Sequence, residues 1–151
     1  MNSSTFFKGQ VLWSQVDANR HLRHSAYADF ATQARSNMLK EYGLTLEDFA
    51  KKQIGPILFR EELHYFREVR LDDYIYVDVQ VAALDPQSGR FSIVHQLYKS
   101  DDTLAATIHI DGAWLNLLTR KRCSIPEAWL AILEQLPKSN EYKNINESSE
   151  I

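Results

Sequence analysis

The residues that could do chemistry gather in one short stretch, DANRHLRHSAY, at positions 17–27. This stretch contains an aspartate, an asparagine, two histidines and two arginines, and it leads into a segment with helical periodicity. An aspartate placed there could attack a carbonyl carbon or activate a water molecule for that attack. The same residue types also form metal sites and polar loops that cap helices, so three interpretations are open.

The spacing of three residues in this stretch raises the possibility of a metal site. Asp17, His21 and His24 are separated by four and three positions, which could bring three ligands together. Such spacing also arises by chance when the segment is a loop. The single cysteine, Cys123, excludes a site built from several cysteines. We therefore expect no metal ligands here and no cofactor.

A helix is predicted from Ser25 onward. Its apolar residues recur at helical spacing and share one face: Tyr27, Phe30, Ala31, Ala34, Met38 and Tyr42. Ser25 is the expected N-cap, and Gly43 is the expected residue just after the helix. The first N–H groups of a helix have no internal partner and lie at the positive end of its dipole. The amides from Ser25 through Ala26 to Tyr27 could therefore bind an oxyanion.

Most of the remaining chain alternates between apolar and polar residues, which predicts strands. We expect strands within 6–16, 57–66, 74–84, 90–100 and 104–119, and short helices over 45–53 and 126–136. One alanine-rich helix followed by an antiparallel meander indicates the α+β class, with a curled sheet wrapped around one long central helix. Gly112 is expected to mark a bulge or a close approach within the last strand.

Length and composition predict a single domain. The chain has 151 residues, of which 44% are hydrophobic and 25% are charged, as in soluble globular proteins. We place the domain at residues 1–137. The segment 138–151 is polar and aperiodic, so we expect a disordered tail.

Charge and hydropathy argue against several classes of partner. The formal net charge of −3 provides no basic field for nucleic acid, and no apolar run approaches the ~18 residues of a membrane span. The N-terminus lacks the pattern of a signal peptide, and one free thiol fits a reducing compartment. We expect a cytoplasmic protein with no nucleic-acid or membrane partner.

Two patches of the sequence follow a spaced pattern. The matching residues are Asp17, His21, Leu22, Tyr27, Ala34 and Arg35 in the first patch, and Tyr65, Arg70, Leu71 and Asp73 in the second. This pattern resembles the hotdog-fold acyl-CoA thioesterase family that includes 4-hydroxybenzoyl-CoA thioesterase. The sequence departs from the family where Arg23 and His24 replace two asparagines, and where Gln33 replaces a glutamate.

The resemblance implies hydrolysis of an acyl-CoA thioester to a free acid and CoA. It implies that Asp17 is the catalytic carboxylate, as nucleophile or general base, and that the helix N-terminus binds the oxyanion. We place His24 and Tyr27 beside Asp17 at the reacting centre, although Tyr27 would also suit the pocket wall. Contacts to the substrate are expected from Asn19, His21, Arg23, Ser25 and Ala26. The alternative for Asn19 and His21 is that they brace the loop by hydrogen bonds.

The densest basic run of the chain follows the last predicted strand. Arg120, Lys121 and Arg122 could pair with the phosphates of coenzyme A. The alternative is a solvated run of charges.

The resemblance also implies a homodimer with two active sites at its interface, often assembled further into a homotetramer. Pairing between the sheet edges of two copies would cover an exposed edge strand.

Two other functions are compatible with the sequence. A dehydratase or hydratase of 3-hydroxyacyl thioesters would use a histidine with an acid, for which His24 and Asp17 are available. A non-catalytic acyl-CoA-binding protein would bind the same ligand without turnover.

Overall fold

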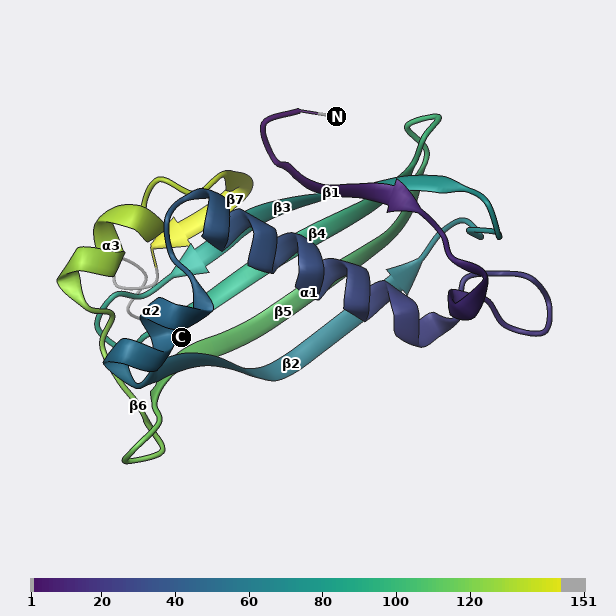
Figure 1. Ribbon diagram of the computed structural model, residues 1–151. Helices are drawn as coiled ribbons and strands as arrows, with labels where there is room; N and C mark the ends of the chain where they lie inside the picture. Colours follow the sequence, from purple (N-terminus) through teal and green to yellow (C-terminus); the bar gives the residue numbers. More distant parts are fainter. Residues whose placement is uncertain (1, 145–151) are drawn as a thin grey trace. The chain divides into compact units, whose positions relative to one another are not determined.

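The computed structural model describes residues 2–144 as seven strands, three α-helices and one 3-10 turn (Figure 1). The strands are β1 (Thr5–Gln10), β2 (Ile54–Tyr65), β3 (Tyr74–Leu84), β4 (Arg90–Lys99), β5 (Leu104–Asn116), β6 (Lys121–Arg122) and β7 (Lys138–Asn144). The helices are α1 (His24–Glu41), α2 (Leu46–Lys52) and α3 (Glu127–Leu133), and the 3-10 turn η1 is Trp13–Gln15. The predicted α+β class is confirmed, but α1 has 18 residues and is of moderate length rather than one long helix.

The strands pair in one sheet whose hydrogen-bonded order is β1-β3-β4-β5-β2, with β6 on β5 and β7 on β3. β1 is antiparallel to β3, with a bulge between Thr5 and Phe7. β3, β4 and β5 are consecutive neighbours and form the expected meander. β2 ends the order and, among the described strands, is hydrogen-bonded to β5 alone.

The described chain divides into two compact units. The first unit comprises residues 2–38, 62–79 and 95–109, and the second comprises 39–61, 80–94 and 110–144. Strands β2 to β5 each contribute residues to both units.

In the first unit, α1 packs its predicted face inward. Ala26, Ala31 and Ala34 are completely buried, which lets the helix backbone approach the strands closely. The ring of Phe30 lies 5.3 Å from that of Phe7 on β1. Of the six residues predicted on this face, Tyr42 alone is half-buried rather than buried, because it lies just beyond the end of α1.

His95 on β4 joins α1 to the sheet within this unit. Its side chain is completely buried. Its Nδ1–H donates to the carbonyl of Ile108 at 2.9 Å, and its Nε2 accepts from Arg35 Nη1 at 3.1 Å. Burial, followed by the charge of Arg35, lowers the pKa of His95 to about 3. The imidazole is therefore neutral at pH 7.

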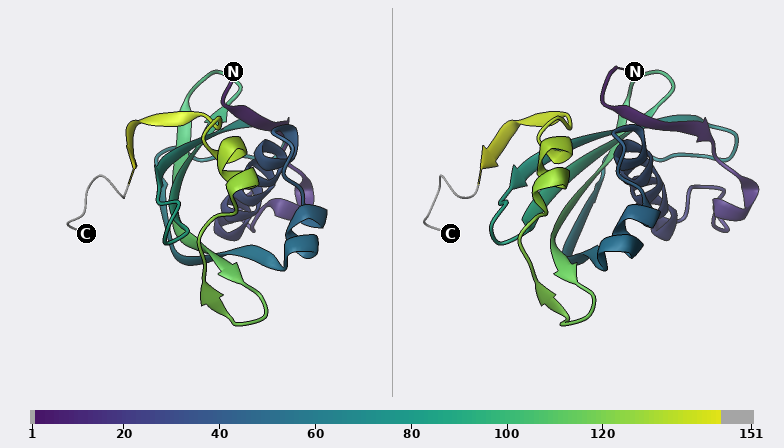
Figure 2. Two further views of the ribbon diagram at one scale, coloured as in Figure 1. Left: turned by 90° about the vertical axis from the view of Figure 1, so that its left-hand side faces the viewer. Right: turned by 60° about the vertical axis from the view of Figure 1, so that its left-hand side comes forward.

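In the second unit an aromatic cluster joins the short helices to the strands. Phe49 on α2 and Trp129 on α3 both pack against Trp114 on β5, with ring centroids 5.3 and 5.6 Å away. A Cβ at Gly112 would lie 2.2 Å from the carbonyl oxygen of Ile57. The close approach predicted at Gly112 is therefore confirmed. Figure 2 shows the β5–β6 hairpin, in green, projecting beyond α3 in this unit.

The prediction of a disordered tail is wrong for residues 138–144. These residues form β7, which pairs in parallel with β3 through Val81, Ala83 and Leu84. On this side of β3, the N-terminal segment pairs only as far as Val79, whose amide donates to the carbonyl of Ser4, so the backbone groups from Val81 onward are left for β7 to satisfy. Backbone pairing needs no apolar side chains, so the polar composition of this segment did not indicate a strand. The last part of the predicted tail, 145–151, lies outside the described residues.

Two other boundaries differ from the prediction. The strand expected within 6–16 ends at Gln10, and the chain then enters η1. The strand expected over 104–119, which is β5, ends at Asn116. The Asn116 side chain accepts hydrogen bonds from the amides of Leu118 and Thr119 and starts a turn there. Within residues 2–144, no helix has the length and apolar character needed to cross a membrane.

The lowered pKa of His95 predicts a pH dependence of folding. The unfolded histidine binds a proton below about pH 6.5, whereas the folded one does not do so until the pH approaches 3. The free energy of unfolding therefore decreases as the pH is lowered across this window, by roughly 2 kcal/mol from about pH 7.5 to about pH 5. Urea unfolding at a series of pH values measures this slope.

The matched variant is His95→Gln, because glutamine can donate to Ile108 and accept from Arg35 without titrating. We expect it to flatten the slope, whereas His64→Gln, at an exposed position, should leave the slope intact. An unchanged slope in His95→Gln would contradict the assignment. Carboxylates with lowered pKa values, such as Asp85, add their own loss only at lower pH.

Candidate active site

The polar stretch folds as a tight loop whose ends pair with each other. The amide of Asp17 donates to the carbonyl of His21 at 2.8 Å, and Val16 and Leu22 form a bridge. Asp17 Oδ1 accepts from the amides of Asn19 at 2.8 Å and His21 at 3.2 Å. Asp17 is thus a turn former through one oxygen. Its Oδ2 has no hydrogen-bond partner within residues 2–144, so it can contact a ligand.

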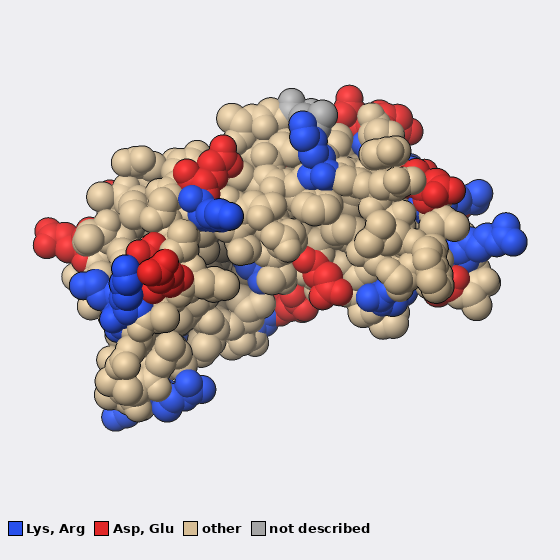
Figure 3. All heavy atoms as spheres, in the orientation of Figure 1, with Lys and Arg blue, Asp and Glu red and all other residues tan. Residues whose placement is uncertain are grey.

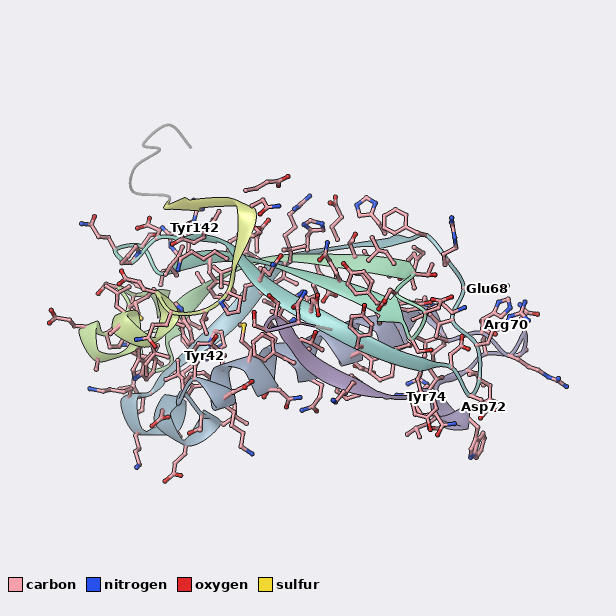
Figure 4. All side chains as sticks on the ribbon, turned by 90° about the horizontal axis from the view of Figure 1, so that it is seen from above. Tyr42, Glu68, Arg70, Asp72, Tyr74 and Tyr142 are labelled. Atoms are coloured by element: carbon pink, nitrogen blue, oxygen red, sulfur yellow. The ribbon has the colours of Figure 1, made fainter. Side chains whose placement is uncertain are left out.

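A second segment, 67–71, lies beside this loop in the first unit. The amide of Leu22 donates to the carbonyl of Val69 at 2.6 Å, and His21 and Arg70 form an antiparallel bridge. Because of this pairing, Glu68 lies next to the loop. Glu68 accepts from Arg70 Nη2 at 2.7 Å and lies 2.5 Å from His21 Nε2. Figure 4 labels Glu68 and Arg70, which lie side by side.

A cavity of about 410 Å³ opens between these segments. Its volume is within the range of small-molecule sites. The lining residues all belong to the first unit: Asp17, His21, Leu22, His24, Tyr27, Tyr65, Phe66, Arg67 and Glu68. Tyr27 and Tyr65 form one wall, with their rings edge to face at 5.0 Å.

The start of α1 differs from the prediction that Ser25 is the N-cap. The helix begins at His24, and the carbonyl of Arg23 already accepts from the amide of Ala26 at 3.0 Å. Ser25 Oγ accepts from Arg23 Nε instead of capping, because the Arg23 guanidinium folds back to the carbonyl of Ser14. Ala26 is completely buried. At the start of α1, the amides of His24 and Ser25 have no backbone acceptor within residues 2–144, so the vacant amides begin one position earlier than expected.

Two groups in the cavity have perturbed pKa values. Burial raises the pKa of Tyr27 to about 12, and the nearby charges of Tyr65, Asp17 and Glu68 contribute in the same direction. Tyr27 therefore keeps its proton and can act as a hydrogen-bond donor, but not as a base. The hydrogen bond from Arg70 lowers the pKa of Glu68, with a smaller contribution from His21, so that Glu68 is a carboxylate.

The structure brings four of the predicted site residues together at the cavity: Asp17, His21, His24 and Tyr27. The other predicted contact residues do not line it: Asn19, Arg23, Ser25, Ala26, Arg120, Lys121 and Arg122. The last three are exposed on the β5–β6 hairpin of the second unit, where Figure 3 shows basic atoms at lower left.

Five lining residues were not predicted at the site. One is Leu22, in the loop itself, and the other four are Tyr65, Phe66, Arg67 and Glu68. These four follow one another at the end of β2 and in the loop after it. Their sequence signal was the second matching patch, which identified a strand pair but not its approach to the loop around Asp17. In the part of the chain that is described, no group of three His, Cys, Asp or Glu residues is placed to bind a metal ion.

Comparison with known proteins gives the family. The model of the thioesterase-like superfamily matches residues 11–133, and the chain belongs to this superfamily. A curated relative, the acyl-CoA thioester hydrolase YbgC of Escherichia coli O157:H7, is 20% identical over 136 residues, which cover 89% of this chain and all of the relative. The resemblance found in the sequence is confirmed.

Solved structures agree on the fold. The protein SAV2348 from Staphylococcus aureus, solved in complex with CoA, has a TM-score of 0.81 at 20% identity, covering 95% of this chain and 92% of its own. Slr0204, a 1,4-dihydroxy-2-naphthoyl-CoA thioesterase from Synechocystis, has a TM-score of 0.78 at 17% identity, covering 87% of this chain and 97% of its own. The fold is the hotdog fold of this family.

Proposed function

We propose that this protein is an acyl-CoA thioesterase that hydrolyses its substrate to a free acid and CoA. The observation that carries the proposal is the cavity. It is lined by a carboxylate with a vacant oxygen, Asp17 Oδ2, and by the first residue of α1, His24. Hydrolysis of a thioester needs a nucleophile or base at the carbonyl carbon and donors for its oxygen. Both are available at this position.

The division of labour follows from the hydrogen bonds. Asp17 Oδ1 is held by two amides, which fixes the direction of Oδ2 as nucleophile or general base. The vacant amide of His24 lies at the cavity and at the positive end of α1, and it would bind the carbonyl oxygen as it gains charge. Tyr27 stays protonated and would donate a further hydrogen bond.

The substrate class rests on the family and its relatives. YbgC is named for acyl-CoA thioesters, and SAV2348 was solved with CoA. Arg67 lines the cavity and is the nearest candidate for a phosphate contact. Arg120, Lys121 and Arg122 remain a second candidate, as an exposed basic hairpin. A cytoplasmic location remains an expectation from the sequence.

A hydratase or dehydratase is less well supported. That alternative paired His24 with Asp17, whereas the histidine–carboxylate contact at the cavity is between His21 and Glu68. Assaying thiol release and enoyl absorbance on the same acyl-CoA panel separates hydrolysis from dehydration. Ligand-induced thermal stabilisation without either product would indicate a binding protein.

Replacing Asp17 tests the mechanism. Asparagine keeps an oxygen that can accept from the amides of Asn19 and His21, so the turn should fold, but it cannot attack or take a proton. We expect Asp17→Asn to lower thiol release from acyl-CoA by at least ~100-fold, with an unchanged circular dichroism spectrum. Asp29→Asn, on the exposed side of α1, is the matched control. Full activity in Asp17→Asn would exclude this mechanism.

A homodimer, with a homotetramer as a further step, is part of the proposal. β2 is an edge strand, and in the second unit it exposes Ile57, Leu58 and Phe59 at 37, 42 and 57%. Seven consecutive residues of β2 are exposed, so neither face of this stretch is covered. Pairing with β2 of a second copy would satisfy its free backbone groups and bury these side chains.

We expect wild-type protein to have at least twice the monomer mass in light scattering, and Phe59→Glu to shift the population toward monomer. The introduced charge would be buried at the interface but harmless on the free edge. The matched control is Leu118→Glu, at a residue that is 73% exposed on the β5–β6 hairpin. A monomeric wild type, or an unshifted Phe59→Glu variant, would contradict pairing through β2.

A further inference from the structure

A carboxylate–imidazole pair at the cavity is not used by the mechanism above. His21 Nε2 lies 2.5 Å from Glu68 Oε2, and both side chains are partly open to water, at 37 and 46% exposure. Glu68 is held in turn by Arg70, whose Nη2 donates to Oε1 at 2.7 Å. Glu68 thus contacts His21 of the loop through one carboxylate oxygen and Arg70 of segment 67–71 through the other.

The contact fixes which nitrogen of His21 carries the proton. An ionised carboxylate can only accept, so the neutral ring must donate its Nε2–H to Glu68. The lone pair is then on Nδ1, which has no hydrogen-bond partner among residues 2–144. A histidine oriented by a carboxylate, with its other nitrogen vacant and its side chain partly open to water, has the arrangement of a general base.

Other groups at the cavity are less suited to this role. Tyr27 holds its proton, because its pKa is raised to about 12. His24 lines the cavity, but within the described residues no hydrogen bond orients its ring. Asp17 has one vacant oxygen and is better placed as the attacking group. A nucleophilic carboxylate forms an anhydride that water must open, and that second step requires a base.

We propose that His21, positioned by Glu68, is the catalytic base that activates water in the second half of the reaction. This inference rests on the thioesterase function proposed above and assigns direct attack to Asp17. In the first step Asp17 Oδ2 bonds to the carbonyl carbon, the C–S bond breaks, and its electron pair leaves with sulfur as the CoA thiolate. The enzyme then carries an acyl-aspartyl anhydride.

In the second step a water oxygen bonds to the acyl carbon, and a proton of that water moves to His21 Nδ1. The bond from the acyl carbon to the Asp17 oxygen breaks, which restores the carboxylate and releases the acid. His21 then passes its proton to the thiolate, giving CoA. The sum is one thioester and one water converted to one acid and one thiol.

The test is a pre-steady-state assay of thiol release by the full chain. Glutamine at position 21 can still donate to Glu68 and brace the loop, but it cannot act as a base. We expect His21→Gln to release a burst of about one thiol per active site and then to turn over at least ~100-fold more slowly than wild type. We expect the same burst in His21→Ala, with the slow phase accelerated by added imidazole.

Glu68 is a positioning residue in this scheme, and its variant should act only through His21. We expect Glu68→Ala to show a burst and a slowed second phase, and His21→Ala/Glu68→Ala to be no slower than His21→Ala alone. The matched control is His64→Ala, because His64 also contacts a carboxylate, that of Glu62 at 3.2 Å, but does not line the cavity. It should behave as wild type.

The outcomes separate the two proposals. A wild type that releases no thiol from any acyl-CoA overturns the thioesterase function and this inference with it. An active wild type with His21→Gln equally active, or with His21→Gln slowed but lacking a burst, overturns this inference alone. A loss in His21→Ala that imidazole does not relieve also overturns it, because a bracing role would not respond to a free base.

Discussion

The backbone pairing between the loop at 16–23 and the segment 67–71 is the constraint on which the site depends. Leu22 donates to Val69, and Leu71 donates to Arg20. These bonds lock the orientation of two short segments that are far apart in the sequence. Without them Glu68 would be a charged residue in a connecting loop, and His21 would have no carboxylate to orient it. The placement of the side chains at the cavity therefore depends on main-chain hydrogen bonds.

Single residues also combine a structural role with one at the cavity. One oxygen of Asp17 closes the turn, and the other is left for a ligand. Arg23 occupies the position before α1 and directs its guanidinium back to the carbonyl of Ser14, and neither residue lines the cavity. The first amides of α1 are thereby left open to an incoming carbonyl rather than satisfied by a serine cap. A residue that departs from the family pattern thus keeps the helix end available.

How much the sequence could predict depends on the range of the interaction concerned. The buried face of α1 and the close approach at Gly112 follow from local periodicity and from the special properties of one residue type. The meeting of His21 with Glu68 depends on pairing across 47 positions, for which the sequence offers no local signal. β7 was missed for a related reason, because its partner is a vacant strand edge and not an apolar surface.

Exposure determines how a site of this kind can work. Water reaches both His21 and Glu68, and near solvent a Coulomb attraction alone contributes little. Orientation by hydrogen bonds must then provide most of the reactivity. Tyr65 ends β2 and lines the cavity, and it is 51% exposed. A second copy paired along β2 would lie against this wall and exclude water from it, which strengthens the electrostatic interactions inside. If β2 is the dimer edge, assembly and chemistry are therefore coupled through Tyr65, and a variant that weakens the dimer should also weaken turnover.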